Sequence, residues 1–116
     1  MGVITTPEEK NRQILERLAA GGDDLGKPRR VDFAHSFPDE AAATAFSRVM
    51  AGRGLRIEIE RTGCVPHLPW DVVVSVDMAP ELNALTVLES GLGQIAVAHG
   101  GRGDGWGCMS GVHDAA

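Results

Sequence analysis

The spacing of apolar residues changes period several times along the chain, and the order of these periods is the feature that most limits the fold. Apolar residues recur every three or four positions in three segments, which predicts amphipathic helices. They alternate with polar residues, or form short valine-rich runs, in four other segments, which predicts strands. The resulting order is one helix followed by strand, helix, strand, strand, helix and strand. This order predicts an α+β fold, a ferredoxin-like βαββαβ sandwich with an extra N-terminal helix.

Helix start and stop signals bound the three helical segments. Thr6, followed by Pro7 and two glutamates, predicts the start of a first helix that reaches Ala20 and stops at a glycine pair. A second helix opens at Pro38-Asp39 and ends at residues 52–54, and a third starts at Pro80 and ends at residues 100–101. The apolar stripes are Ile14, Leu15 and Leu18; Ala42, Phe46, Val49 and Met50; and Leu82, Leu85, Leu88, Leu92, Ile95 and Ala96.

The predicted strands cover residues 31–37, 55–60, 70–78 and 106–109, and an eight-residue loop, 62–69, joins the second to the third. With a strand order of 4-1-3-2, that loop, Phe37-Pro38 and a turn at residues 104–106 meet at one end of the sheet. The predicted core is Phe33, Phe46, Val72, Val74, Val76, Leu85, Leu88, Leu92 and Ile95.

Length and charge narrow the class of protein. A chain of 116 residues is the size of one domain and can bury about two-thirds of its unfolded surface. The 16 acidic and 11 basic residues give a net charge of −5, which opposes non-specific attachment to nucleic acid or anionic membrane and favours a basic partner. We find neither a membrane-spanning run nor a secretory signal, and the two cysteines fit a reducing compartment, so we expect a cytoplasmic protein.

The glycine-rich segment before the C-terminus carries the most specific motif. Five of the eight residues from Gly100 to Gly107 are glycine, which predicts a tight, unusual backbone path. Within it, Asp104-Gly105-Trp106-Gly107 holds a tryptophan between glycines. We expect Trp106 to be at least half buried against the end of the last helix, and a surface contact role for the same residues stays open.

This motif resembles the C-terminal signature of the regulator of ribonuclease E activity B family, and the resemblance extends from about Asn11 to Gly107. Further similar segments are Gly22-Asp23-Asp24-Leu25, Lys27-Pro28-Arg29, Val31-Asp32-Phe33 leading to Phe37-Pro38, and Trp70-Asp71-Val72-Val73-Val74. The sequence departs from the family at Gly103, where an aromatic residue is expected, and it carries no long acidic C-terminal tail. The resemblance implies an α+β sandwich at residues 30–110, preceded by a helix and linker at 1–29 and followed by a short tail at 111–116.

The resemblance also implies a function: a non-catalytic regulator that docks on ribonuclease E, or a relative, and lowers its activity. The sheet face opposite the core is predicted to be acidic, and such a face repels RNA phosphates and suits a basic protein segment. The expected contact residues are Asp104, Gly105 and Trp106, together with Asp32, Glu58, Glu60, Asp71 and Asp77. The alternative is a small ligand-binding or homo-oligomerising module without a link to ribonuclease E.

Other chemistries find little support in the residue pattern. Cys64 with His67 and Cys108 with His113 have zinc-ligand spacings, but we expect them on opposite edges of the sheet, so we predict neither a metal site nor a Cys64–Cys108 disulfide. His35 and His99 are expected to be structural or solvent-facing. The alternating glycines do not follow a dinucleotide-binding spacing, and a strand follows them instead of a helix. The sequence therefore predicts no cofactor and no catalytic residue.

Overall fold

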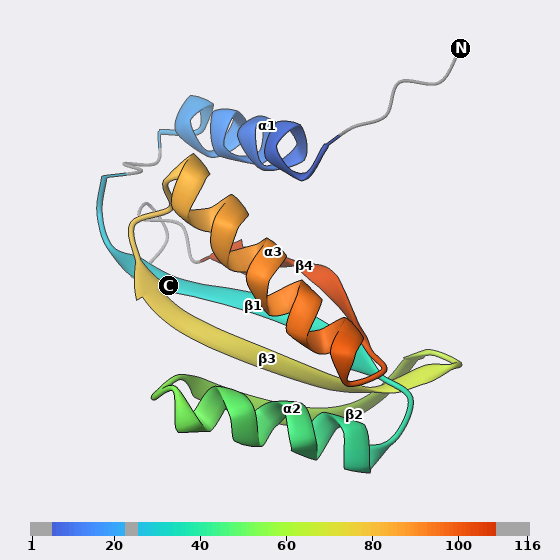
Figure 1. The fold of residues 1–116 in the computed structure, drawn as a ribbon. Coiled ribbons are helices and arrows are strands. Elements are labelled where there is room, and N and C mark those ends of the chain that lie inside the picture. Colours follow the sequence, from blue (N-terminus) through green and yellow to red (C-terminus); the bar gives the residue numbers. More distant parts are fainter. Residues whose placement is uncertain (1–5, 23–25, 109–116) are drawn as a thin grey trace.

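Within the part of the chain that the structure describes, four strands form one antiparallel sheet and three helices complete an α+β fold, as expected (Figure 1). This computed structural model describes residues 6–22 and 26–108. Along the chain the elements are α1 (Pro7–Ala20), β1 (Arg29–Phe37), α2 (Glu40–Gly52), β2 (Arg56–Val65), β3 (Leu68–Met78), α3 (Leu82–Ala98) and β4 (Arg102–Cys108). None of the helices in the described ranges is both long and apolar enough to cross a bilayer.

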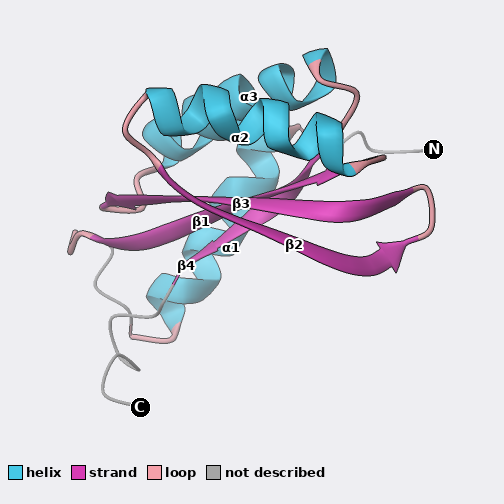
Figure 2. Ribbon diagram, turned by 90° about the horizontal axis from the view of Figure 1, so that it is seen from below, coloured by secondary structure: helices cyan, strands magenta, loops and turns pink. Residues whose placement is uncertain are grey.

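The strands are ordered β2-β3-β1-β4, so β1 and β3 are central and β2 and β4 are the edges. Helices α2 and α3 lie on the same side of this sheet (Figure 2). Every second residue of a strand faces these two helices. Phe33 of β1 is one of them, and its partners in the neighbouring strands are Val74 of β3 and Trp106 of β4. The sheet therefore has one face covered by helices and one face that carries neither α2 nor α3.

One apolar core fills the space between the sheet and these two helices. The fully buried side chains include Phe33, Phe37, Phe46, Val72 and Leu85. All nine predicted core residues belong to this cluster, although Val76, Leu88 and Ile95 are only partly buried at its rim. One residue of the predicted stripe of α2 is misplaced: Val49 is 37% exposed, and its neighbours Ala43 and Ser47 are buried instead.

Side-chain caps fix the starts of the helices. The Thr6 hydroxyl accepts from the backbone N–H of Glu9 at 3.1 Å, and the Asp39 carboxylate accepts from that of Ala42 at 2.8 Å. Both caps satisfy backbone donors that have no partner within the helix. The third helix begins two residues later than Pro80, because the Glu81 carboxylate takes the capping position and accepts from the N–H groups of Asn83 and Ala84.

The predicted eight-residue loop between β2 and β3 is wrong. The two strands continue through this segment as a hairpin, with Val65 opposite Leu68 across a turn at Pro66 and His67. Pro66 lies in the turn, where no ladder hydrogen bond is needed. The register shifts between Arg61 and Val65, and this irregular pairing tolerates the second proline, Pro69.

The predicted turn at residues 104–106 and the predicted bounds of the last strand are also wrong. Strand β4 starts at Arg102 and includes the whole glycine-rich motif, and its register with β1 shifts between Ala34 and His35. Asp104 is the extra residue of this bulge, and Gly105 follows it with φ of +108°. A bulge therefore supplies the unusual backbone path that the glycines indicated.

Just before β4, Gly101 lies too close to β1 for any side chain. A Cβ atom at this position would be 2.4 Å from the Ser36 carbonyl oxygen and 2.5 Å from the Phe37 ring. The glycine pair after α3 thus lets the chain pass directly over β1 before it joins the sheet. This close approach sets where β4 starts.

Helix α1 lies beside α3 at the β4 edge of the sheet (Figure 1). Its inner face carries Leu15, which is 7% exposed, and Asn11, which is fully buried. The C-terminal half of β4 therefore lies next to a helix that is far from it in sequence.

Candidate functional site

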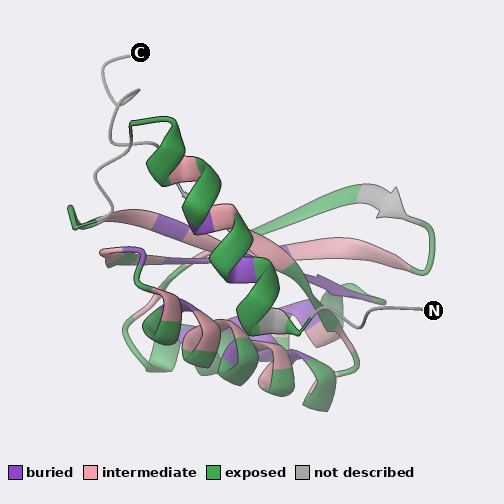
Figure 3. Cartoon of the chain, turned by 90° about the horizontal axis from the view of Figure 1, so that it is seen from above, coloured by how far each residue is buried: buried purple, intermediate pink, exposed green. Residues whose placement is uncertain are grey.

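The sheet face opposite α2 and α3, which we call the open face, gathers the predicted acidic residues from all four strands. Register places Asp32 and Ser36 of β1 on this face, opposite Ser75 and Asp71 of β3. Glu58 and Glu60 of β2 and Asp77 of β3 share it. The edge strand β2 is largely exposed, whereas β1 and β3 are mostly buried or half-buried (Figure 3).

A row of polar side chains crosses the open face from one edge of the sheet to the other. Thr62 of β2 donates to Asp71 of β3 at 3.0 Å, and the Ser36 hydroxyl of β1 lies 3.2 Å from the other oxygen of Asp71. Ser36 also bonds to Asp104 of β4. Ser36 is almost fully buried between these two carboxylates, and its single hydroxyl proton is donated to one of them at a time. Arg102 closes the row, because its Nε atom donates to Asp104 at 3.0 Å.

A second polar group lies on the same face, toward the other end of the sheet. The Asp32 carboxylate accepts from Ser75 at 2.7 Å and from Arg30 at 2.8 Å. Asp32 also raises the pKa of Arg30, by the hydrogen bond and by its charge. A terminal nitrogen of Arg30 lies 3.8 Å from Glu58, so one guanidinium bridges two strands.

The charge of the open face is acidic, but less so than the sequence pattern suggested. Three arginines share it: Arg30, Arg56 opposite Ser75, and Arg102 opposite Ser36. The alternation of residues along β1 and β2 places Arg30 and Arg56 on the same face as the predicted acids. The sequence alone therefore contained the information that this face also carries arginines. The carboxylates still outnumber the guanidinium groups by six to three; they belong to Asp32, Glu58, Glu60, Asp71, Asp77 and Asp104.

Trp106 of the motif lies on the other face of the sheet from these acids. It is opposite the buried Phe33, and it is partly buried against the core. Its indole N–H donates to the Asn11 carbonyl at 2.7 Å, and the Asn11 amide in turn lies 3.2 Å from Thr86 and from Glu89. These α3 partners belong to the first half of the helix, so Trp106 does not lie at its end as predicted. The motif therefore splits between the two faces.

A groove opens at the outer edge of β4, between this strand and the two neighbouring helices. Its volume is about 520 Å³, and it is lined by Arg102, Gly103, Asp104 and Gly105 of β4, Thr6 and Lys10 at the start of α1, and Glu89 and Ser90 of α3. Sequence reasoning missed it, because α1 approaches β4 only in three dimensions.

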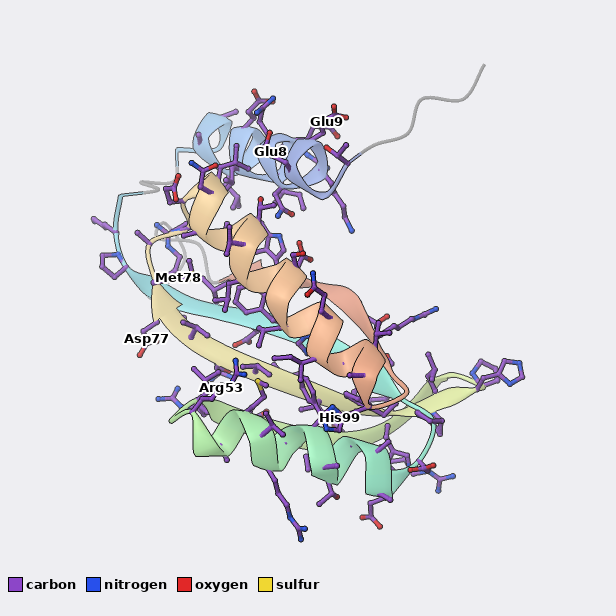
Figure 4. All side chains as sticks on the ribbon, in the orientation of Figure 1. Glu8, Glu9, Arg53, Asp77, Met78 and His99 are labelled. Carbon is purple, nitrogen blue, oxygen red and sulfur yellow. The ribbon has the colours of Figure 1, made fainter. Side chains whose placement is uncertain are left out.

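An apolar hollow of about 490 Å³ lies on the helical layer, between Arg53 at the end of α2 and one side of α3. Its α3 wall includes Val87, which is 73% exposed, and Leu88. Figure 4 shows Arg53 and His99 at opposite ends of the space between the two helices. The hollow therefore combines an apolar wall with one cationic side chain at its edge.

His35 and His99 have structural surroundings, as expected. His35 is 2% exposed, its ring centre lies 4.9 Å from that of Phe46, and its Nδ1 lies 3.4 Å from the Val72 carbonyl oxygen. Burial lowers the pKa of His35, although the Val72 carbonyl and the Asp104 carboxylate oppose the shift. His99 bonds to the Ile95 carbonyl within its own helix.

The prediction of no metal site and no disulfide stays a prediction. His113 and the side chains of Cys64 and Cys108 lie outside the described residues, and within the described part of the chain no cluster of three metal-ligating side chains occurs. The backbones of the two cysteines belong to β2 and β4, the opposite edges of the sheet. Three strand spacings separate these edges by about 14 Å, against a disulfide reach of about 7 Å between Cα atoms.

Taken together, these features define a small α+β protein with a helix-covered sheet face and an open acidic face. The family model of RraB, described as Regulator of ribonuclease activity B, matches residues 8–108, which is nearly the whole chain. The chain therefore belongs to the RraB family. A search of curated proteins found no match.

Proposed function

We propose that this protein is a non-catalytic regulator that binds a ribonuclease, ribonuclease E or a relative, through the open face of its sheet. The observation that carries the proposal is the concentration of six carboxylates on one sheet face of an RraB family member. Complementary charge speeds the encounter between proteins and selects against wrong partners. The chemistry of this face thus favours a partner segment rich in arginine or lysine.

The order of polar and apolar residues across the open face suits a segment rich in arginine or lysine. Ala34, Val73 and Gly105 form a row of small residues in the middle of the face, between the two polar groups. Arginine and lysine stems pack well on a small apolar strip while their charged ends reach acids at its sides. A guanidinium can also bind a carboxylate through two parallel hydrogen bonds.

The acids of this face fall into two kinds. Asp32, Asp71 and Asp104 are held in place by hydroxyl and guanidinium donors, and each carboxylate retains lone pairs for a further bond. Glu58, Glu60 and Asp77 are exposed. We expect the exposed acids to attract the partner and the held ones to fix its position.

Gly105 and Trp106 support this site in different ways. Gly105 lies in the middle row, where the absence of a side chain lets a partner approach the backbone. Trp106 lies on the opposite face, so its proposed contribution is to hold β4 and α1 in place.

The proposal extends to fold type and location. The strand order and the two helices on one face support assignment to the ferredoxin-like βαββαβ group. A regulator of RNA degradation would act in the cytoplasm, where the reducing conditions also suit a chain with two cysteines.

Titration of ribonuclease E from the same organism, followed by calorimetry at two salt concentrations, tests the proposal. We expect binding that weakens strongly as salt rises, because screening shortens from about 8 Å at physiological ionic strength to about 3 Å at 1 M. An absence of binding at low salt would exclude this partner. Salt-insensitive binding would keep the partner and reject the acidic face as the basis of affinity.

A pair of charge-reversal variants locates the surface. Glu60→Lys changes an exposed acid of the open face, and Glu16→Lys makes the same change in charge at an exposed position of α1. We expect Glu60→Lys to weaken binding several-fold at low salt and Glu16→Lys to have a much smaller effect. Equal losses would show that only the net charge of the protein matters.

A further inference from the structure

The outer edge of β4 differs from the other edge of the sheet because a groove runs along it. Among the described residues, β4 pairs only with β1, so its other edge has no strand partner. Alternate residues of an edge strand direct their N–H and C=O groups away from the sheet. The groove beside residues 102–105 gives a ligand access to these groups.

Glycines leave this part of the edge without bulky side chains. A Cβ atom at Gly105 would meet nothing within 4 Å, and at Gly103 its nearest neighbour would be Gly93 of α3 at 3.8 Å. The bulge at Asp104 turns that side chain toward Ser36 and Arg102. The backbone of the strand therefore forms one wall of the groove, and α1 and α3 form the others.

Most charged groups around the groove already have partners. Asp104 is bonded to Ser36 and Arg102, and Glu89 accepts from Asn11 at 3.2 Å. The exception is Lys10, whose ammonium group makes no ion pair within the described part of the chain. The exposed, unpaired charge of the groove is therefore the Lys10 ammonium, whereas the Glu89 carboxylate is half-buried and hydrogen-bonded to a neutral amide.

We propose that this groove binds a short, extended peptide segment that carries an acidic side chain, and that the segment adds to β4 as a fifth strand. Main-chain hydrogen bonds to the β4 edge would give affinity, and contact of the acid with Lys10 would give specificity. The four β4 residues of the groove span about 13 Å, so about four residues of the segment pair. This inference does not rest on the proposed ribonuclease site, which prefers the opposite charge, although Asp104 and Gly105 border both surfaces.

The test uses three synthetic hexapeptides and nitrogen-15-labelled protein. The first is acetyl-Thr-Val-Asp-Val-Thr-Val-amide, the second has lysine in place of aspartate, and the third is the aspartate peptide with N-methyl groups on every backbone amide, which blocks both of its edges. We expect the first peptide to shift the backbone amide signals of residues 102–105 and of Lys10. The lysine peptide should bind about three- to fivefold more weakly at low salt, and the N-methylated peptide should not bind.

Two charge-reversal variants complete the test. Lys10→Glu should reverse the preference between the aspartate and lysine peptides, whereas Lys27→Glu, at an exposed position outside the groove, should leave it unchanged. Absence of shifts in residues 102–105 at millimolar peptide, or shifts confined to the open-face residues of β2 and β3, would overturn the proposal. Equal binding of the N-methylated peptide would overturn strand addition, and an unchanged preference in Lys10→Glu would overturn the role of the acid.

Discussion

The two edges of the sheet are protected in different ways. Strand β2 carries alternating charged residues, Arg56, Glu58 and Glu60, and most of its residues are exposed. Strand β4 has glycines at alternate positions and lies beside α1, which is anchored to it by the bond from Trp106 to Asn11. An unpaired strand edge can join another chain, and charges or a covering element prevent this.

The difference shows what each edge needs from the rest of the molecule. The charges of β2 belong to the strand itself, so this edge needs no other element. The β4 edge has few side chains of its own, so its cover comes from a helix that is distant in the chain. The bond that joins them links Trp106 to Asn11, 95 residues earlier. That cover reaches the Trp106 half of the strand and leaves the groove at residues 102–105. The edge with fewer side chains is thus the one with a candidate binding groove.

Removing the indole of Trp106 should have the largest effect. Trp106→Ala deletes a partly buried aromatic side chain between β4 and α1, and we expect the free energy of unfolding to fall by about 3 kcal/mol. Chemical denaturation followed by circular dichroism measures it. An unchanged unfolding midpoint would mean that Trp106 is not part of the core and that α1 is held by other contacts.

Removing the partner of the indole should cost less. Asn11→Ala leaves the Trp106 N–H, Thr86 and Glu89 without a buried partner, and we expect a loss of about 2 kcal/mol. Gln13→Ala, at an exposed position of the same helix, is the matched control and should change stability by less than about 0.5 kcal/mol. Equal effects of the two substitutions would reject the polar anchor between α1 and β4.

Acid should weaken the β4 side of the sheet through His35, which lies at the start of the bulge. Burial lowers the folded-state pKa of His35, so the unfolded chain binds its proton more readily. The stability that the protein gains by burying neutral His35 is fully present above the unfolded-state pKa of about 6.5. As pH falls from there to the folded-state pKa, the free energy of unfolding decreases by at most about 1.4 kcal/mol per pH unit.

Urea unfolding at several pH values between 5 and 8, about the range where histidine titrates, measures this loss. In His35→Gln the same range should be flatter, because the buried titrating group is gone. A slope equal to that of the unaltered protein would assign the acid sensitivity to other groups.

Removing charge from the β2 edge should change stability least and association most. The double variant Glu58→Val and Glu60→Val keeps the strand but removes its acidic protection, and we expect self-association with little change in unfolding free energy. Light scattering after size-exclusion chromatography detects it. Glu9→Val with Glu16→Val removes two exposed acids from α1 and should not cause association; if it does, net charge and not the strand edge is responsible.

The sequence predicted the regular elements well and the glycine-rich and proline-containing segments poorly. Thr6 and Asp39 cap their helices as expected, because a cap depends on residues three positions apart. Residues 62–69 were predicted to be a loop, whereas the pairing of β2 with β3 continues through this segment to Val65 and Leu68 and depends on the neighbouring strand, which local residue types do not show. The glycines of β4 misled for the same reason, since their strand is formed by pairing with β1.

For the candidate site, alternation along each strand was sufficient to place Asp32, Glu58, Glu60, Asp71 and Asp77 on one face. The same alternation also places Arg30 and Arg56 on this face, where they reduce its negative charge. The position of Trp106 on the opposite face depended on the bulge at Asp104, which shifts the register by one residue and therefore changes which side chains share a face.

By itself, the sequence determined the α+β class, the order of the elements, the core and the family, because these follow from local periodicity, capping and motif. Only the tertiary structure decided the bridge from Asp71 through Ser36 to Asp104, the anchor from Trp106 to Asn11 and the groove beside Lys10. Each of these joins residues that are 35 or more positions apart. Such contacts depend on strand order, register and helix docking, which a local pattern of residue types does not contain.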